Sequence, residues 1–255
     1  DECPYDAEND ADDDGICCSA NPDYALRFNG IDDYVDCGNP LYQNFNSNGE
    51  LRISFDVNVD SDNFHAGRLV SYSSQNPDDS FHIGVHIEDD GDINYGVCKI
   101  SSTSNNACQG VNSNISTYDD WVNITVTYNQ GDLTLYIDNE LRAQANYDGP
   151  YATASNQAKL FFGRSYWINS FDSENAYLGL LDNVSIWDSE NNGNLIGEWN
   201  FNDGNGDILY DSSNNNNGNI IGPEWEQLDG DICCYDVDND SDNDGVCGGE
   251  DVCPG

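Results

Sequence analysis

The sequence contains no methionine and very few basic side chains. Its 255 residues include 7 Lys and Arg against 48 Asp and Glu, which gives a formal charge of -41 at pH 7. Nucleic acids and anionic membrane surfaces both require a basic face, so this charge argues against either partner. No apolar run approaches the roughly 20 residues that span a bilayer, and we expect no membrane insertion. Because methionine and a signal peptide are absent, we expect a processed product or an excised segment.

The aromatic and cysteine contents indicate a folded extracellular protein. Five Trp, fifteen Tyr and nine Phe supply large surfaces to bury, which opposes the disorder that high charge and low hydrophobicity favour. The ten Cys, an even number, fit an oxidising compartment better than the cytosol. We therefore expect the protein to be extracellular or at the cell surface.

Alternating apolar residues predict an all-β core. Such a period of two is found over 51–59, 81–87, 93–97, 122–128 and 133–137. Further strands are predicted over 24–29, 68–73, 159–163, 177–187 and 195–201. Asn, Asp and Gly fill the turns, where positive φ angles are common. About a dozen strands spaced roughly 8–12 residues apart predict an antiparallel β-sandwich or jelly roll.

Two acidic, cysteine-rich arms flank this core and repeat each other. The segment from Asp6 to Cys17 aligns with the segment from Asp236 to Cys247 at an offset of 230, with the acids, an Asn, a Gly and a Cys in register. The D-x-C-P pattern that opens the chain returns from Asp251 onward, which suggests one period of a longer array or a head-to-tail subunit. The predicted parts are an arm over 1–22, a β-domain over 23–228 and an arm over 229–255.

The repeated D-x-D-x-D-G motif has the chemistry of a calcium-binding loop. Carboxylates at loop positions 1, 3 and 5 can surround one hard cation, Gly at position 6 permits the sharp turn, and a carbonyl at 7 and an acid at 12 complete the shell. Carboxylates about 5 Å apart repel by roughly 0.8 kcal/mol per pair even in water, so a cation is the natural way to order them. The alternative is a solvated acidic tail. The Gly placement, the flanking cysteines and the repetition oppose that alternative.

We therefore predict Ca2+ as the cofactor of both arms. The predicted ligands are Asp6, Glu8, Asp10, Asp12 and Asp14 in the first arm, and Asp236, Asp238, Asp240, Asp242, Asp244, the Val246 carbonyl and Asp251 in the second. Position 12 of the first loop is Asn21, a weaker ligand, so this site either binds less tightly or takes a ligand from elsewhere. With their C-P dipeptides the arms resemble thrombospondin type 3 repeats, which implies stacked calcium ions in a disulfide-tied ribbon.

The β-domain resembles the laminin-G-like, concanavalin-like jelly-roll family. The stretches that carry the resemblance are 25–35, 133–138, 162–165, 180–187 and 197–204. They are signatures of the fold, since their aromatic residues and glycines set packing and turns. The family consists mainly of binding and adhesion modules, so the resemblance implies a binder without naming its ligand. Some members also carry a calcium ion at the rim, for which Asp32 and Asp33 are the candidates here.

The sequence contains no recognisable catalytic constellation, and we predict that the protein is not an enzyme. Retaining glycoside hydrolysis needs two carboxyls about 5 Å apart, whereas Asp182 and Glu198 are single acids with an expected structural role. His82 and His86 are about 13 Å apart along one strand, too far to share a metal ion. No Ser or Cys nucleophile and no phosphate-binding loop stand out.

Tyr166 and Trp167 are the candidate contacts for a carbohydrate. They lie in the long segment 164–177 and could offer a flat stacking surface to a sugar. The alternative, with equal weight, is that Trp167 covers the edge of the sandwich.

The cysteines support an assembly. Cys98 and Cys108 lie close in sequence beside a hairpin, and their disulfide would contribute about 3 kcal/mol. Seven others lie in the arms, an odd number, so one of them must reach Cys37 or leave the chain. One alternative is that Cys253 bonds a neighbouring chain, and other connectivities remain open.

Two functions fit these features. The leading hypothesis is a calcium-dependent structural or adhesive module, joined head to tail through its arms into a fibre, a matrix or an adhesin stalk. The alternative is a carbohydrate-binding, lectin-like domain with calcium-rigidified spacers. The candidate partners are therefore a second copy of the chain, and a glycan or a matrix protein.

We predict that calcium controls the assembly of this protein. Without a cation the Asp ladders repel themselves, so calcium should convert the arms into rigid connectors. Electron microscopy of native, non-reduced protein should show ordered polymers with calcium that come apart in excess EGTA. Dispersed single particles in both conditions would contradict this hypothesis.

Overall fold

The computed structural model describes most of the predicted β-domain. The described ranges are 23–44, 49–60, 67–74, 81–87, 92–99, 107–116, 120–146, 156–167, 170–171, 176–190, 193–213 and 215–228. The two arms lie outside these residues, and so do all of the predicted calcium ligands, from Asp6 to Asp14 and from Asp236 to Asp251.

The described residues form two eight-stranded sheets and a short hairpin. Sheet A contains, in spatial order, β10 (Glu140–Asn146), β9 (Asp132–Ile137), β8 (Trp121–Asn129), β3 (Glu50–Val59), β14 (Leu178–Trp187), β1 (Tyr24–Asn29) and β18 (Glu224–Gln227), with β15 (Leu195–Trp199) also paired to β14. Sheet B contains β16 (Ile208–Leu209), β17 (Gly218–Ile221), β2 (Tyr34–Asp36), β11 (Ala158–Phe162), β4 (Gly67–Ser74), β5 (Phe81–Ile87), β6 (Asp92–Lys99) and β7 (Ala107–Ser116). The hairpin consists of β12 (Tyr166–Trp167) and β13 (Ser170–Phe171).

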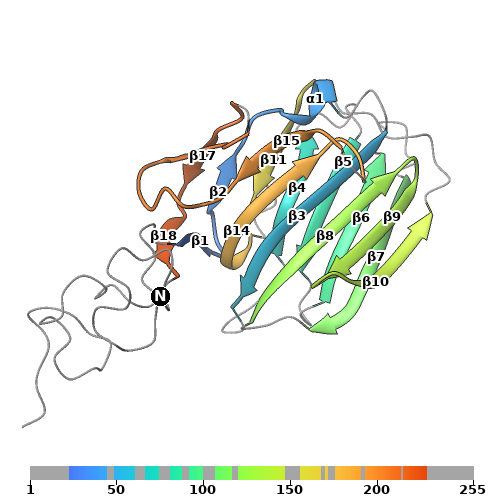
Figure 1. The fold of residues 1–255 in the computed structure, drawn as a ribbon, viewed down its shortest axis with the longest axis horizontal. Coiled ribbons are helices and arrows are strands. Elements are labelled where there is room, and N and C mark those ends of the chain that lie inside the picture. The colour runs from blue at the N-terminus through green and yellow to red at the C-terminus, as the bar shows by residue number, and fades with distance from the viewer. Residues whose placement is uncertain are drawn as a thin grey trace, which may run out of the picture.

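The two sheets pack face to face as a β-sandwich of the jelly-roll type. Figure 1 shows sheet A in front of sheet B, and one helical turn, α1 (Leu41–Asn44), lies at the rim. All pairings between the named strands are antiparallel. The predicted all-β fold class is therefore confirmed. None of the described helices is long and apolar enough to cross a membrane.

The core forms where the inward residues of the two sheets meet. In β3 every second residue is buried, from Leu51 to Val59, which is the pattern of a half-buried strand. Large aromatic side chains fill the space between the sheets, and Phe162 packs edge-on against Trp199 with ring centroids 5.3 Å apart. This burial of aromatic surface stabilises a chain whose high net charge opposes compaction.

The C-terminal part of the described chain completes both sheets. β16 and β17 form one edge of sheet B, and β18 forms one edge of sheet A. The turn between β16 and β17 is organised by Asp211, whose carboxylate accepts hydrogen bonds from the backbone of Glu198, Ser213 and Asn216. Burial acts to raise the pKa of Asp211, but these hydrogen bonds outweigh it and the pKa is lowered.

The predicted strands with strong alternation are confirmed, while several polar strands were missed. Two residues, Gln130 and Gly131, join β8 to β9 and both have positive φ, as the turn chemistry predicted. The strand β7 was not predicted, because its exposed positions carry Gly and Asn and give no apolar period. The short strands β2, β12, β13, β16 and β17 and the edge strands β10 and β18 were not predicted either.

We predict that alanine at Gly163 destabilises the sandwich more than alanine at Gly206. Both glycines have positive φ, 80° and 86°. A Cβ at Gly163 would lie 2.3 Å from the Phe28 ring, whereas at Gly206 no atom lies within 4 Å. Gly206→Ala should therefore cost about 1 kcal/mol of backbone strain, and Gly163→Ala about 3 kcal/mol, since overpacking is added. Urea denaturation measures both, and equal losses would contradict the close packing at Phe28.

Candidate functional site

The outer face of sheet B contains a row of three glycines. Gly84 in β5 pairs with Gly96 in β6, and Gly96 pairs with Gly110 in β7. The residues next to them in sequence, such as Val85, Tyr95 and Val111, are buried in the core, so the glycines face outward. We call these three residues the glycine row. Because they have no side chains, the backbone of the sheet is less covered by its own side chains here than at the neighbouring polar positions His86, Asn94 and Asn112.

A polar row runs beside the glycine row. His86, Asn94 and Asn112 pair across the same three strands, and Arg68 of β4 pairs with His86. All four side chains are half-buried. His86, Asn94 and Asn112 each lie two residues along their strand from a member of the glycine row, or about 7 Å. The polar row thus provides amide, imidazole and guanidinium groups beside the backbone of the glycine row. These groups can form hydrogen bonds with the hydroxyl groups of a ligand.

The glycine row is closed at the β4 end by the chain that leaves β11. Ser71 of β4 pairs with Gly84, and although it lies on the outer face it is fully buried. Its Oγ donates a 2.7 Å hydrogen bond to the Arg164 carbonyl. Phe161, which pairs with Ser71, is also buried on this face. The segment that leads from β11 into the β12–β13 hairpin therefore covers this half of the sheet.

The opposite end of the glycine row is open. Gly84 is buried, Gly96 is half-buried and Gly110 is exposed. Among the described residues, a Cβ at Gly110 would meet the Tyr95 carbonyl at 3.3 Å and the Gly96 Cα at 3.9 Å, both in the neighbouring strand β6. Along the glycine row the backbone is therefore covered beside β4 and exposed to solvent at β7.

The predicted carbohydrate contacts belong to the hairpin on this face. Tyr166 pairs with Phe171 and Trp167 with Ser170, and β12 lies beside β4. The side chains of Tyr166 and Trp167 lie outside the described part of the structure. Ser165, which precedes them, is 1% exposed, and within the described chain its Oγ has no hydrogen-bond partner. Such a hydroxyl is uncommon, since buried polar groups are normally paired.

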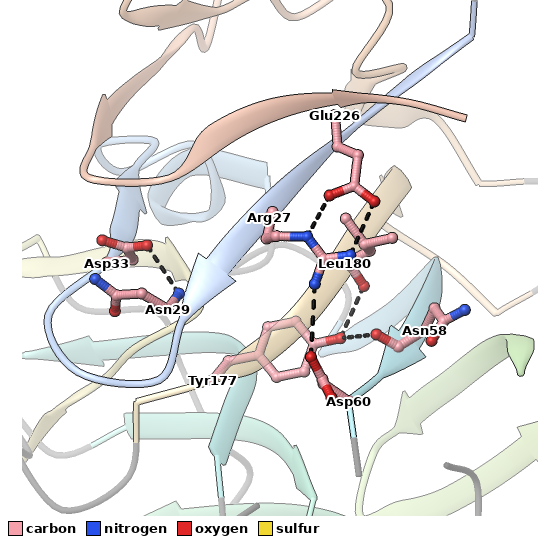
Figure 2. A network of polar contacts seen from close by, with 8 residues as sticks. All are labelled: Arg27, Asn29, Asp33, Asn58, Asp60, Tyr177, Leu180 and Glu226. Carbon is pink, nitrogen blue, oxygen red and sulfur yellow. Dashed lines mark hydrogen bonds and ion pairs between the residues drawn. The ribbon is translucent and has the colours of Figure 1, made fainter. Parts of the chain in front are cut away.

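The turn that contains Asp32 and Asp33 is held by its own hydrogen bonds. The Asn29 backbone N–H donates to Asp33 Oδ2 at 2.8 Å, as Figure 2 shows, and the Asn29 side chain donates to Asp32 Oδ1 at 3.0 Å. Burial raises the pKa of Asp33. No group of three or more metal-ligating side chains occurs among the described residues. The geometry thus adds no support to a calcium ion at this rim.

The remaining sequence candidates fall in different places. His82 lies on β5, with a side chain outside the described part, and His86 lies in the polar row. Cys98 pairs with Cys108 across β6 and β7, so the register brings the predicted disulfide partners opposite each other. Cys37 is a free thiol buried in the core. The arm cysteines lie outside the described residues, so the pairing of Cys37 with one of them stays a prediction.

The chain belongs to the concanavalin A-like lectin/glucanases superfamily. A laminin-G-type family model of that description matches residues 29–196, which is more than half of the chain. Sheets A and B extend beyond this match through β16, β17 and β18. A search of curated proteins found no match.

Solved structures share the fold at low sequence identity. A candidate carbohydrate-binding protein from Bacteroides ovatus is 15% identical, with a TM-score of 0.58 over 84% of this chain and 62% of its own. The LG1–3 region of the laminin alpha2 chain is 16% identical, with a TM-score of 0.50 over 68% of this chain and 32% of its own. The NanB sialidase of Streptococcus pneumoniae is 12% identical, with a TM-score of 0.50 over 66% of this chain and 26% of its own. The chain thus spans less than two thirds of each of these proteins.

We predict opposite effects for alanine at two buried serines of the covering segment. Ser71→Ala leaves the Arg164 carbonyl without its hydrogen bond and should lower the free energy of unfolding by about 1–3 kcal/mol. Ser165→Ala removes a hydroxyl that has no partner among the described residues, so stability should stay the same or rise. Urea denaturation of the two variants checks this, and a larger loss for Ser165→Ala would contradict the assignment.

Proposed function

We propose that the chain is an extracellular, non-catalytic binding module whose sheet B recognises a glycan. The observation that carries this proposal is the glycine row, which is exposed at β7 and lies between the polar row and the segment that leads to Tyr166 and Trp167. Carbohydrate sites combine planar hydrogen-bonding side chains with an aromatic surface for the sugar ring. The polar row would supply the hydrogen-bonding side chains. The β12–β13 hairpin would supply the aromatic surface through Tyr166 and Trp167, which were selected by residue type.

The charge of the protein favours a neutral glycan. With a formal charge of -41, the protein repels sulfated or acidic sugars at long range. Arg68 is the one cationic member of the polar row, and it lies beside the half of sheet B that is already covered. The described members of the two rows nearest the open end, Gly110 and Asn112, are neutral. A neutral oligosaccharide therefore fits this surface better than an acidic one.

A binding role fits the polar row better than a catalytic role. Glycoside hydrolysis requires a pair of carboxyl groups about 5 Å or more apart at the scissile bond. The polar row consists of amides, an imidazole and a guanidinium, and it contains no carboxylate. The superfamily includes lectins as well as glucanases, and the similar Bacteroides ovatus protein is described as a candidate carbohydrate-binding protein. Both descriptions are compatible with glycan recognition at this face.

We predict that the protein binds neutral glycans through sheet B. A glycan array identifies the ligand, and calorimetry then measures its affinity for the wild type and for His86→Ala, Asn94→Ala and Trp167→Ala. Each lost hydrogen bond or stacking contact should cost about 1 kcal/mol, or roughly fivefold in affinity. Gln144→Ala is the matched control, because Gln144 is an exposed polar residue on β10 of sheet A.

Two outcomes would contradict the glycan proposal. One is an array with no signal above background, and the other is equal affinity for the wild type and all three sheet B variants. A loss confined to Gln144→Ala would move the site to sheet A. Circular dichroism of each variant separates lost binding from lost folding.

A second function rests on the arms. The repeat at an offset of 230 supports a calcium-dependent structural or adhesive module that self-associates through these segments. Their predicted ligands, from Asp6 to Asp14 and from Asp236 to Asp251, alternate as a calcium-binding loop requires. The two functions are compatible, since a polymer of such modules would display many glycan sites at once. The microscopy with calcium and EGTA tests this second function independently of the glycan array.

A further inference from the structure

Both arms leave the described sandwich at one point, which we call the root. The root comprises Asp23, the residue that follows the first arm, and Leu228, the residue that precedes the second arm. The Leu228 N–H donates a 2.9 Å hydrogen bond to the Asp23 carbonyl. The strands that follow and precede these residues, β1 and β18, pair with each other along the edge of sheet A. The attachment of both arms therefore depends on how firmly β1 and β18 are held.

Arg27 fastens the root to the rest of sheet A. Figure 2 shows its guanidinium between Glu226 of β18 and Asp60, which follows β3. Nε and Nη2 donate to the two carboxylate oxygens of Glu226, the second bond being 2.8 Å long, and Nη1 lies 3.6 Å from Asp60 Oδ2. The hydrogen bond to Arg27 lowers the pKa of Glu226. One cation is thus shared between two carboxylates.

A third and a fourth carboxyl group lie beside this contact in sheet A. Asp182 of β14 pairs with Asp56 of β3, so the acid that was interpreted as single has another directly opposite. Asn183, with φ of 51°, forms a bulge that lets its side chain reach both. Its Nδ2 donates to Asp56 Oδ2 and to Asp182 Oδ2, each at 3.1 Å, and its backbone N–H donates to Asp182 Oδ1 at 2.6 Å.

The charges around Asp182 are predominantly negative. The carboxylates of Asp56 and Asp23 act on it from β3 and from the root, and Glu198 lies on β15, opposite Ser185. The nearest cation along β1 is Arg27, opposite Leu180, and it is already bound to Glu226 and Asp60. Asp182 is 3% exposed, and burial, followed by the effects of Asp23 and Asp56, raises its pKa to about 7 despite the hydrogen bond from Asn183.

We propose that the root is a pH-responsive joint, in which Asp182, Asp56 and Asp23 keep strands β1 and β18 paired to sheet A in mildly acidic medium and loosen them in alkaline medium. At a pH below its pKa, Asp182 is a buried neutral acid beside Asp56 and Asp23. When it ionises, a buried negative charge lies near the carboxylates of Asp56 and Asp23. Separation of β1 from β14 would move Asp23 away and let water reach Asp182, which lowers the cost of its charge.

The direction of the pH dependence follows from the raised pKa. A carboxyl whose pKa is higher in the folded than in the unfolded state stabilises the fold below its unfolded pKa, and this stabilisation is lost as the pH rises through the folded value, here about 7. Glu226 has the opposite sign, because its pKa is lowered by Arg27 and its contribution is lost as the pH falls through this lowered pKa. The root should therefore be firmest between these two limits.

Hydrogen exchange measured by mass spectrometry tests the joint in the full chain. Exchange in peptides from β1 and β18, corrected for the intrinsic pH effect, should rise about tenfold between roughly pH 6 and pH 8.5, since pH 6 lies about one unit below the pKa of Asp182 and the effect levels off above that pKa. Asp182→Asn should abolish this rise, and Asp207→Asn, at an exposed acid in the loop before β16, should leave it unchanged. A chelator in every sample prevents a cation from neutralising the carboxyl groups.

A direct titration keeps the proposal testable if Asp182→Asn fails to fold. The carboxyl carbon of Asp182 can be followed by nuclear magnetic resonance in the wild type, and its signal should titrate near pH 7. Titration near pH 4 would overturn the proposal. Equal pH dependence of exchange in the wild type and in Asp182→Asn would overturn it as well. A rise that appears equally in β8 and β9 would mean global unfolding, and would also count against a local joint.

Discussion

Sheet A depends on a single strand, β14, because three other strands pair with it. β3 follows it on one side, while β1 pairs with its first part and β15 with its second part on the other. The bulge at Asn183 lies between these two parts, and a bulge bends a strand and increases its twist. One strand can therefore serve two neighbours along one side. The same bulge brings Asp182 and Asp56 together, so the geometry of the sheet and its local charge cannot be changed separately.

The core of the sandwich could be predicted from the sequence because burial follows a period of two along a single strand. The alternation in β3 and β8 marks which residues face inward, whatever strand lies beside them. The strand β7 could not be predicted in this way, since Gly110, Asn112 and Asn114 carry no apolar signal. The hairpin of β12 and β13 has two-residue strands, which are too short to show any period.

The candidate site was harder to predict, because it depends on the register between strands. Each member of the glycine row is an unremarked glycine in its own strand, and only the pairing of β5, β6 and β7 aligns the three. Tyr166 and Trp167 were selected by residue type alone, and the contact of β12 with β4 adds the face to which they belong. Asp182 was interpreted as a single acid for the same reason, since its neighbour Asp56 is far away in sequence.

The adjacency of Asp23 and Leu228 determines how the sandwich can be attached to anything larger. The chain enters and leaves the domain at neighbouring positions, joined by a backbone hydrogen bond. A domain whose ends meet can be inserted into a longer chain without separating the segments on its two sides. In a polymer of such units, the segments that connect them would set the length of the polymer axis, and each sandwich would project from this axis. Because sheet B would not take part in joining the units, its exposed face could bind a ligand on each of them.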